Sequence, residues 1–193
     1  MRLTLAAAVL LTATALARAE DAPKAADAEK VADDGLEALR KADWKAYAEL
    51  LHPDSLKAFR DEIVPALKAA DKAGKADKEL LGIFDGAKDV ETVLAWKPEE
   101  FFVKTMTSLT RAPATKAMFT TRKAKVVGTV LEGKDLAHVV VRVTVKVDPV
   151  EMKYVGVVQL KRKGDKWKLL ADDLVSGLAT GVKRTCELQT SRP

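Results

Sequence analysis

Four valine-rich segments in the second half of the chain constrain its fold more than any other feature. They cover Lys125–Leu131, Leu136–Val147, Met152–Lys161 and Lys166–Ala171, and the turn-forming stretches EGKD, DPVE and KGD separate them. Valine favours extended backbone, and connections this short join neighbouring antiparallel strands. We therefore expect a four-stranded antiparallel meander.

The second of these segments indicates which side of the sheet is buried. Every second position from Ala137 to Val147 is alanine or valine, whereas the positions between them include His138, Arg142 and Lys146. Because successive side chains of a strand point to opposite faces, the first set predicts the core face and the second a solvated face.

The same alternation divides the third segment. It puts Tyr154 on the core face as the one polar side chain there, and Val155 and Val157 on the outer face. Two exposed valines side by side on an outer face predict that a second copy of the chain covers the open side of the sheet. We therefore expect a homodimer through the outer sheet face.

The stretch KRKGDKWK, Lys161–Lys168, is a basic hairpin tip with a tryptophan, a combination that can bind nucleic acid. Trp167, however, falls on the core face of its strand, which leaves the lysines as a solvated surface. Together with the export signal described below, this placement argues against nucleic acid as a partner.

Helical patterns precede the valine-rich segments. Apolar residues recur at helical spacing in 28–41, 44–51, 56–67 and 98–109. Gly35 weakens the first of these helices, and Pro65 predicts a kink or break in the third. Helices first and a sheet last define an α+β domain, with the N-terminal helices packed on one face of a curved sheet. We place this single domain at 28–174 and a C-terminal tail or short helix at 175–193.

The N-terminus has the features of a secretory signal peptide. Arg2 precedes an uncharged run from Leu3 to Leu16, and Ala17-Arg18-Ala19 provides the small-x-small cleavage pattern. The run is shorter than the roughly 20 residues of a membrane-spanning helix. We expect cleavage after residue 19, a flexible lead-in at 20–27, and an exported protein, periplasmic or secreted, with no membrane span. Loss of Arg2 and Arg18 lowers the net charge from +5 to +3.

The stretch ADWKAYAELLHPDSLKAF contains one of only two histidines in the chain. Asp43 stands where an N-cap belongs, and Pro53 disfavours helical backbone at His52, so the chain must turn there. Two roles are open for His52. It is a general base oriented by Asp54, or it ends one helix while Asp54 or Ser55 caps the next.

The element order and the phrase DWKAYAELLHPD together resemble the nuclear-transport-factor-2-like superfamily, whose members have a cone-shaped α+β fold. That superfamily includes isomerases, dehydratases and polyketide cyclases as well as non-catalytic ligand-binding and dimerising domains. The resemblance implies a pocket in the cone, and we expect its ligand-binding residues to be Trp44, Tyr47, Phe102, Met106 and Tyr154.

Other chemistries lack their motifs. Two histidines and the single Cys186 form no metal-binding or disulfide pattern, and the glycines near Ser176 match neither a phosphate-binding loop nor a nucleophile elbow. We expect no metal or cofactor. The hypothesis that follows is an exported, non-enzymatic domain that binds a small apolar ligand or a protein partner. The alternative is a lyase or isomerase using His52 with Asp54 or Tyr154 in the cone.

Overall fold

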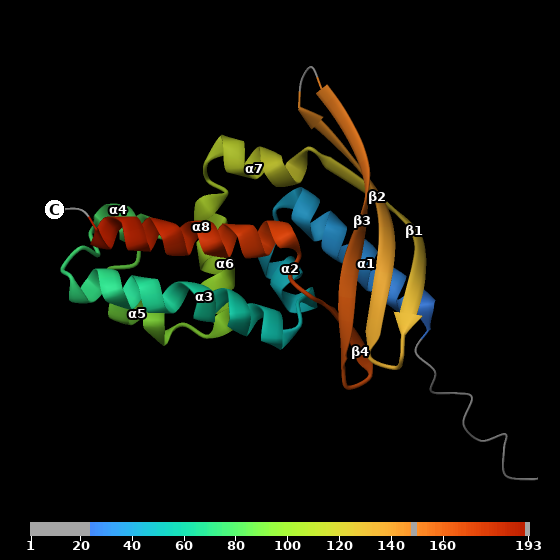
Figure 1. The fold of residues 1–193 in the computed structure, drawn as a ribbon, viewed down its shortest axis with the longest axis horizontal. Helices are drawn as coiled ribbons and strands as arrows, with labels where there is room; N and C mark the ends of the chain where they lie inside the picture. The colour runs from blue at the N-terminus through green and yellow to red at the C-terminus, as the bar shows by residue number, and fades with distance from the viewer. Residues whose placement is uncertain (1–23, 148–149, 192–193) are drawn as a thin grey trace, which may run out of the picture.

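The protein is elongated, with a sheet at one end and a group of helices extending from it (Figure 1). The computed structural model describes residues 24–147 and 150–191. The expected signal peptide, 1–19, therefore lies outside the described residues. The last described residues of the chain, which end at 191, lie far from the sheet, at the tip of the helical part (Figure 1).

The sheet is the antiparallel meander that the valine-rich segments predict. Its strands follow chain order: β1 (Arg122–Glu132), β2 (Leu136–Val147), β3 (Val150–Lys163) and β4 (Lys166–Leu169). Ala137, Val139 and Val141 are buried, which confirms the predicted core face of β2. We call this the inner face of the sheet and the opposite side the outer face.

Eight helices complete the described part of the chain. They are α1 (Ala25–Lys41), α2 (Trp44–Leu50), α3 (Pro53–Lys72), α4 (Lys78–Gly82), α5 (Val90–Ala95), α6 (Pro98–Leu109), α7 (Pro113–Thr120) and α8 (Asp173–Thr190). With the sheet they confirm the α+β fold class. The short α7 was not predicted, and α1 includes 25–27, which we had expected in the flexible lead-in.

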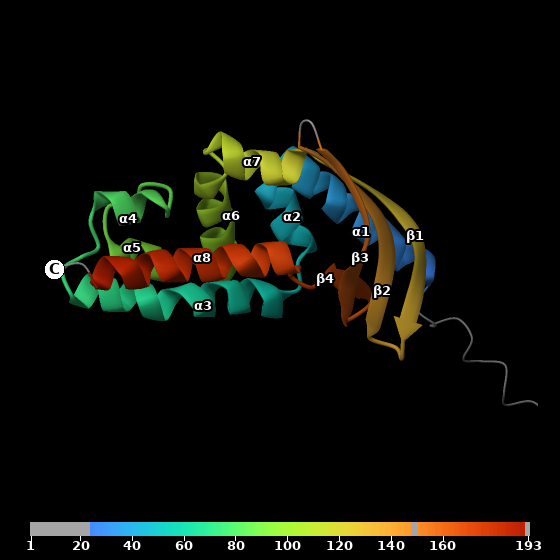
Figure 2. The same ribbon diagram turned by 45° about the horizontal axis from the view of Figure 1, so that its top comes forward.

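Helix α1 lies along the inner face of the sheet (Figure 2). Its buried residues there are small, Ala28, Ala32 and Gly35, so that the backbone comes close to the strands. A Cβ atom added at Gly35 would lie 2.4 Å from Leu169 Cδ1 at the end of β4. The glycine that weakens the helix locally therefore permits its packing against the sheet.

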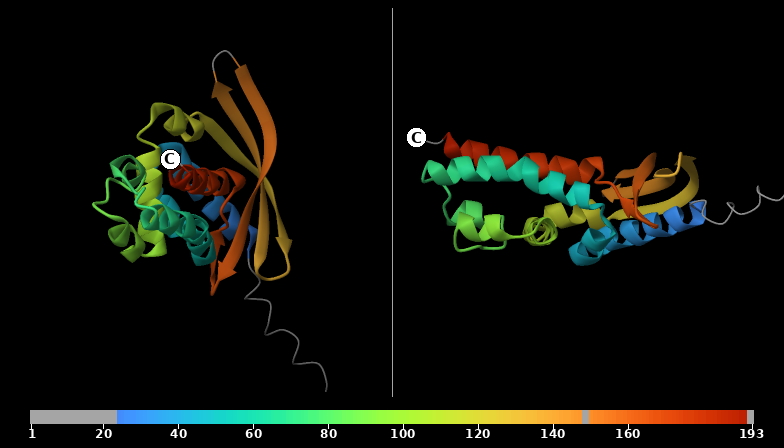
Figure 3. Two further views of the ribbon diagram at one scale, coloured as in Figure 1. Left: turned by 60° about the vertical axis from the view of Figure 1, so that its left-hand side comes forward. Right: turned by 90° about the horizontal axis from the view of Figure 1, so that it is seen from below.

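Helices α3 and α8 lie side by side over most of their length and form the long axis of the helical part (Figure 3). The expectation of a C-terminal tail or short helix at 175–193 is therefore wrong. Val175, Ala179, Val182 and Cys186, which recur at helical spacing, are buried in α8. The packed domain thus extends well beyond residue 174.

Helix α3 also differs from its prediction. It continues through Pro65 to Lys72, so the expected break does not occur. Pro65 is exposed, so the missing hydrogen bond lies on the solvent side of the helix. The helix instead ends before Gly74, which has a positive φ of 67°.

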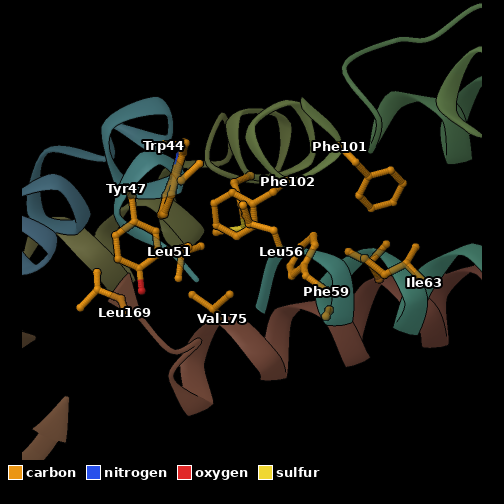
Figure 4. Close-up of a cluster of buried hydrophobic side chains, with 14 of the residues drawn as sticks. Trp44, Tyr47, Leu51, Leu56, Phe59, Ile63, Phe101, Phe102, Leu169 and Val175 are labelled. Atoms are coloured by element: carbon orange, nitrogen blue, oxygen red, sulfur yellow. The ribbon is translucent and has the colours of Figure 1, made fainter. Parts of the chain in front are cut away.

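A cluster of aromatic side chains forms the core between the two parts of the molecule (Figure 4). Trp44 packs edge-on against Phe119, with ring centroids 4.8 Å apart, and Phe102 lies 5.0 Å from Phe59. Trp44 Nε1 donates a buried hydrogen bond of 2.9 Å to Thr110 Oγ1. This bond ties α2 to the end of α6.

Candidate functional site

A cavity of about 680 Å³ lies between α1, the inner face of the sheet and the start of α8. Its volume is within the range of small-molecule sites in proteins, about 300–1,000 Å³. Its apolar lining includes Ala32, Leu36, Leu39, Phe119, Val141, Val143, Val158, Leu169 and Leu174. A molecule with an apolar body fits this lining.

Small residues line both walls of the cavity. Gly156 on β3 lies opposite Val141 of β2, where the neighbouring inner-face positions of β3 carry Tyr154 and Val158. On the other wall, α1 contributes Ala32 and Gly35. A Cβ at Gly156 would make only ordinary contacts, the nearest at 3.6 Å with a Val141 methyl, so a larger side chain there would project into the space.

Tyr47 supplies a buried hydroxyl to the cavity lining. Its side chain is 3% exposed, and the hydroxyl points toward Leu169, another lining residue (Figure 4). Among the described residues, none forms a hydrogen bond with this hydroxyl. Burial, with a smaller contribution from Asp172, holds the pKa of Tyr47 well above its ordinary value, while Arg122 opposes the shift. The phenol is therefore a neutral donor available to a ligand.

Arg122 and Tyr154 form a second polar group in the lining. Arg122 begins β1, and its Nη2 donates to Tyr154 Oη at 2.5 Å. Tyr154 has the predicted inner-face orientation but is 40% exposed, because it borders the cavity instead of packing in the core. Within 24–147 and 150–191, no carboxylate forms an ion pair with Arg122.

Four carboxylates also line the cavity, and two of them have partners. Arg40 and Lys41 bind Glu37 and lower the pKa of that carboxyl to about 2. Asp172 Oδ1 accepts the backbone N–H of Val175 at 2.8 Å and so caps α8. The other two, Asp33 and Asp173, are exposed. The acidic groups are therefore neutralised, used as caps, or open to water.

His52 does not line this cavity. It is buried at the corner between α2 and α3, where its backbone N–H donates to the carbonyl of Leu169 at 2.7 Å. Its Nδ1 accepts the N–H of Asp54 at 3.2 Å, so His52 is itself the N-cap of α3. The expectation that Asp54 or Ser55 caps this helix is wrong: Asp54 is exposed, and Ser55 Oγ accepts the N–H of Ala171.

The structure brings two of the five expected ligand-binding residues to the cavity, Tyr47 and Tyr154. Trp44, Phe102 and Met106 lie in the aromatic core beside it and are almost fully buried.

Sequence reasoning missed Arg122 and Asp172. Arg122 shares the inner face with Ala124, but it lies before Lys125, where the expected strand begins. Asp172 is the N-cap of α8 and lies before residue 175, where the tail or short helix was expected to begin.

The outer face of the sheet has an apolar part and a basic part. Val155 and Val157 are 64% and 53% exposed, and Val157 lies opposite Val140 of β2. In the basic part, Lys125 lies directly opposite Arg142. That a second copy of the chain covers this face stays a prediction.

No group of three or more histidine, cysteine, aspartate or glutamate side chains in 24–147 and 150–191 is arranged to hold a metal ion. None of the helices in that part of the chain is both long and apolar enough to cross a bilayer.

Comparisons of the chain with protein-family models, curated proteins and solved structures found no match. The resemblance to the nuclear-transport-factor-2-like superfamily therefore stays a prediction. The function must be argued from the cavity itself.

Proposed function

We propose that the protein is an exported, non-enzymatic domain that binds a small, largely apolar molecule in the cavity beneath α1. The observation that carries the proposal is the cavity itself, which has the volume of a ligand site, apolar side chains on both walls, and the neutral hydroxyl of Tyr47, for which no hydrogen bond is found among the described residues. A ligand that accepts the proton of this hydroxyl would gain a hydrogen bond inside the cavity.

The arrangement of the candidate acid–base residues supports binding over catalysis. The alternative, a lyase or isomerase, needs His52 together with Asp54 or Tyr154 beside a bound substrate. His52 lies outside the cavity lining, and its Nδ1 is occupied as the cap of α3. Tyr154 is at the cavity, but its hydroxyl accepts from Arg122. The three groups do not share a site with room for a substrate.

Native mass spectrometry of the purified chain, followed by identification of any co-purifying molecule, tests the proposal. The variant Gly156→Val should place an isopropyl group inside the cavity, narrow it at β3 and weaken binding of that molecule at least about tenfold. Valine suits the middle of a strand, and the added Cβ meets no atom closer than 3.6 Å, so the fold should persist.

Gly128→Val is the matched control. It makes the same substitution in β1, where an added Cβ has nothing within 4 Å, and should leave binding unchanged. Equal binding by the wild-type chain and Gly156→Val would place the ligand elsewhere and contradict the proposal. So would turnover of a small molecule that depends on His52.

The exposed valines of the outer face support a protein partner as a second mode of binding, and a second copy of this chain is the partner that the sequence predicts. Val155 and Val157 lie next to each other on that face with about half or more of their surface in water. Sedimentation velocity at rising concentration measures such self-association. A monomer at 100 µM and above would remove this part of the proposal.

A further inference from the structure

The charges around the cavity are unevenly matched, and one cation lacks a counterion. Arg40 is held by Glu37, with Nη2 and Oε1 2.6 Å apart. Arg122, by contrast, is half-buried and donates only to the neutral Tyr154 hydroxyl among the described residues. A guanidinium partly removed from water and left without an anion is unfavourable, so a ligand anion would be stabilised there.

Arg122 and Tyr47 are placed to act on the same ligand. Both line the cavity, and the charge of Arg122 opposes the rise in the Tyr47 pKa, so that the two groups interact through space. A guanidinium binds the two oxygens of a carboxylate through parallel N–H groups, and a phenol donates one further hydrogen bond. The sheet side of the cavity adds the apolar side chains of Val141, Val143 and Val158.

We infer that the cavity selects molecules with a carboxylate head and an apolar body, the head bound by Arg122 with help from Tyr47 and the body lying over the inner-face valines. This inference rests on the proposed ligand-binding function and adds the chemical class of the ligand. Tyr154 is a positioning residue, because its hydroxyl holds the Arg122 guanidinium at the cavity. Of the lining carboxylates, Glu37 is paired with Arg40, and Asp33 and Asp173 are exposed to water. Asp172 keeps its negative charge as the cap of α8 and acts on Tyr47, so the carboxylate head is expected to lie at Arg122.

Isothermal titration calorimetry with matched probes tests the inference. The probes are octanoate, 1-octanol and octylamine, which share a chain and differ in the head group, and a second set of 2-naphthoate and 2-naphthylmethanol. The wild-type chain should bind at least one carboxylate about tenfold or more tightly than its alcohol. Octylamine should bind no better than the alcohol.

Variants of the lining residues then show which side chains cause the preference for a carboxylate head. Arg122→Gln should bring the carboxylate affinity down to that of the alcohol while the alcohol affinity stays within about twofold. Arg122→Lys should keep part of the preference for carboxylates, because lysine retains the positive charge but lacks the paired N–H groups of the guanidinium. Tyr154→Phe should reduce the preference without abolishing it, because the guanidinium loses its orienting contact and keeps its charge. Circular dichroism checks that each variant is folded.

The outcomes separate this inference from the proposed function. Alcohols that bind as tightly as carboxylates, or an unchanged preference in Arg122→Gln, overturn the inference and leave the cavity as a binding site. Tighter binding of octylamine also overturns it. If no probe binds and the Gly156→Val comparison shows no cavity ligand, the proposed function and the inference both fall.

Discussion

Thr105 offers a direct test of the packing between α6 and the helical core. Its side chain is completely buried, and within the described residues its Oγ1 has no hydrogen-bond partner. Leaving a buried polar group unsatisfied costs about 1–3 kcal/mol, and valine replaces the hydroxyl with a methyl of the same shape. Valine and threonine have similar helix propensities, so the substitution hardly changes the intrinsic stability of the helix. We therefore expect Thr105→Val to raise the free energy of unfolding by about 1–2 kcal/mol.

Thr110, one residue beyond the same helix, provides the matched control. Its Oγ1 accepts from Trp44 Nε1 at 2.9 Å and donates to the carbonyl of Met106 at 2.7 Å. Thr110→Val removes the acceptor and leaves the indole N–H buried without a partner, which should lower the free energy of unfolding by about 1–3 kcal/mol. The same threonine-to-valine substitution is thus expected to change the free energy of unfolding in opposite directions at two positions of one segment.

Urea unfolding followed by far-ultraviolet circular dichroism and tryptophan fluorescence measures both variants. A change of 1 kcal/mol corresponds to a shift in Tm of about 2–4 °C for a chain of this size. The reasoning is refuted if Thr105→Val destabilises the protein, or if both variants change stability by the same amount and sign. Unequal m-values between variants would indicate a changed unfolded state instead.

Two further predictions concern charge and the single thiol. Lys125→Glu should replace a repulsive cross-strand pair with Arg142 by an attractive one and raise the free energy of unfolding, measured with urea, by about 0.2–1 kcal/mol. The gain should shrink at high salt. Lys123→Glu is the control, because Lys123 lies opposite the uncharged Thr144. An equal gain at both positions would show that only the net charge matters. Burial raises the pKa of the Cys186 thiol to about 11, so at pH 8 a disulfide reagent should label it no faster than the chain unfolds. Because the pKa of the thiol in the folded protein lies above the ordinary value of 9.0, its stabilising contribution is complete below pH 9 and is lost as the pH rises through about 11. Rapid labelling of the folded chain at pH 8 would contradict the burial of Cys186, and so would a free energy of unfolding that does not change between pH 8 and pH 11.

Local patterns predicted much of the fold. The alternation of valine with polar residues repeats with the period of a strand, and Gly133 and Gly164, both with positive φ, lie in the connections that separate the strands. Asp43 caps α2 as expected, because an N-cap depends only on residues within one turn. These features need no knowledge of the rest of the chain.

The features that the sequence did not predict depend on contacts between distant segments of the chain. Gly177 and Gly181 lower the helix propensity of α8, and burial of its apolar side against α3 compensates for them. The cavity combines α1, all four strands and the start of α8, so no single stretch reveals it. Arg122 could be assigned to the inner face only after the register of β1 against β2 was known.

Leu169 links three parts of the molecule. Its side chain packs against Gly35 of α1, and its carbonyl accepts the His52 N–H at the start of α3. A single residue thus joins the sheet, the helix over the cavity and the long helical part. Separation of the two parts must break this hydrogen bond, so the His52 amide should exchange with deuterium only in the global opening of the protein, and a molecule bound against Leu169 should slow that exchange from within the cavity.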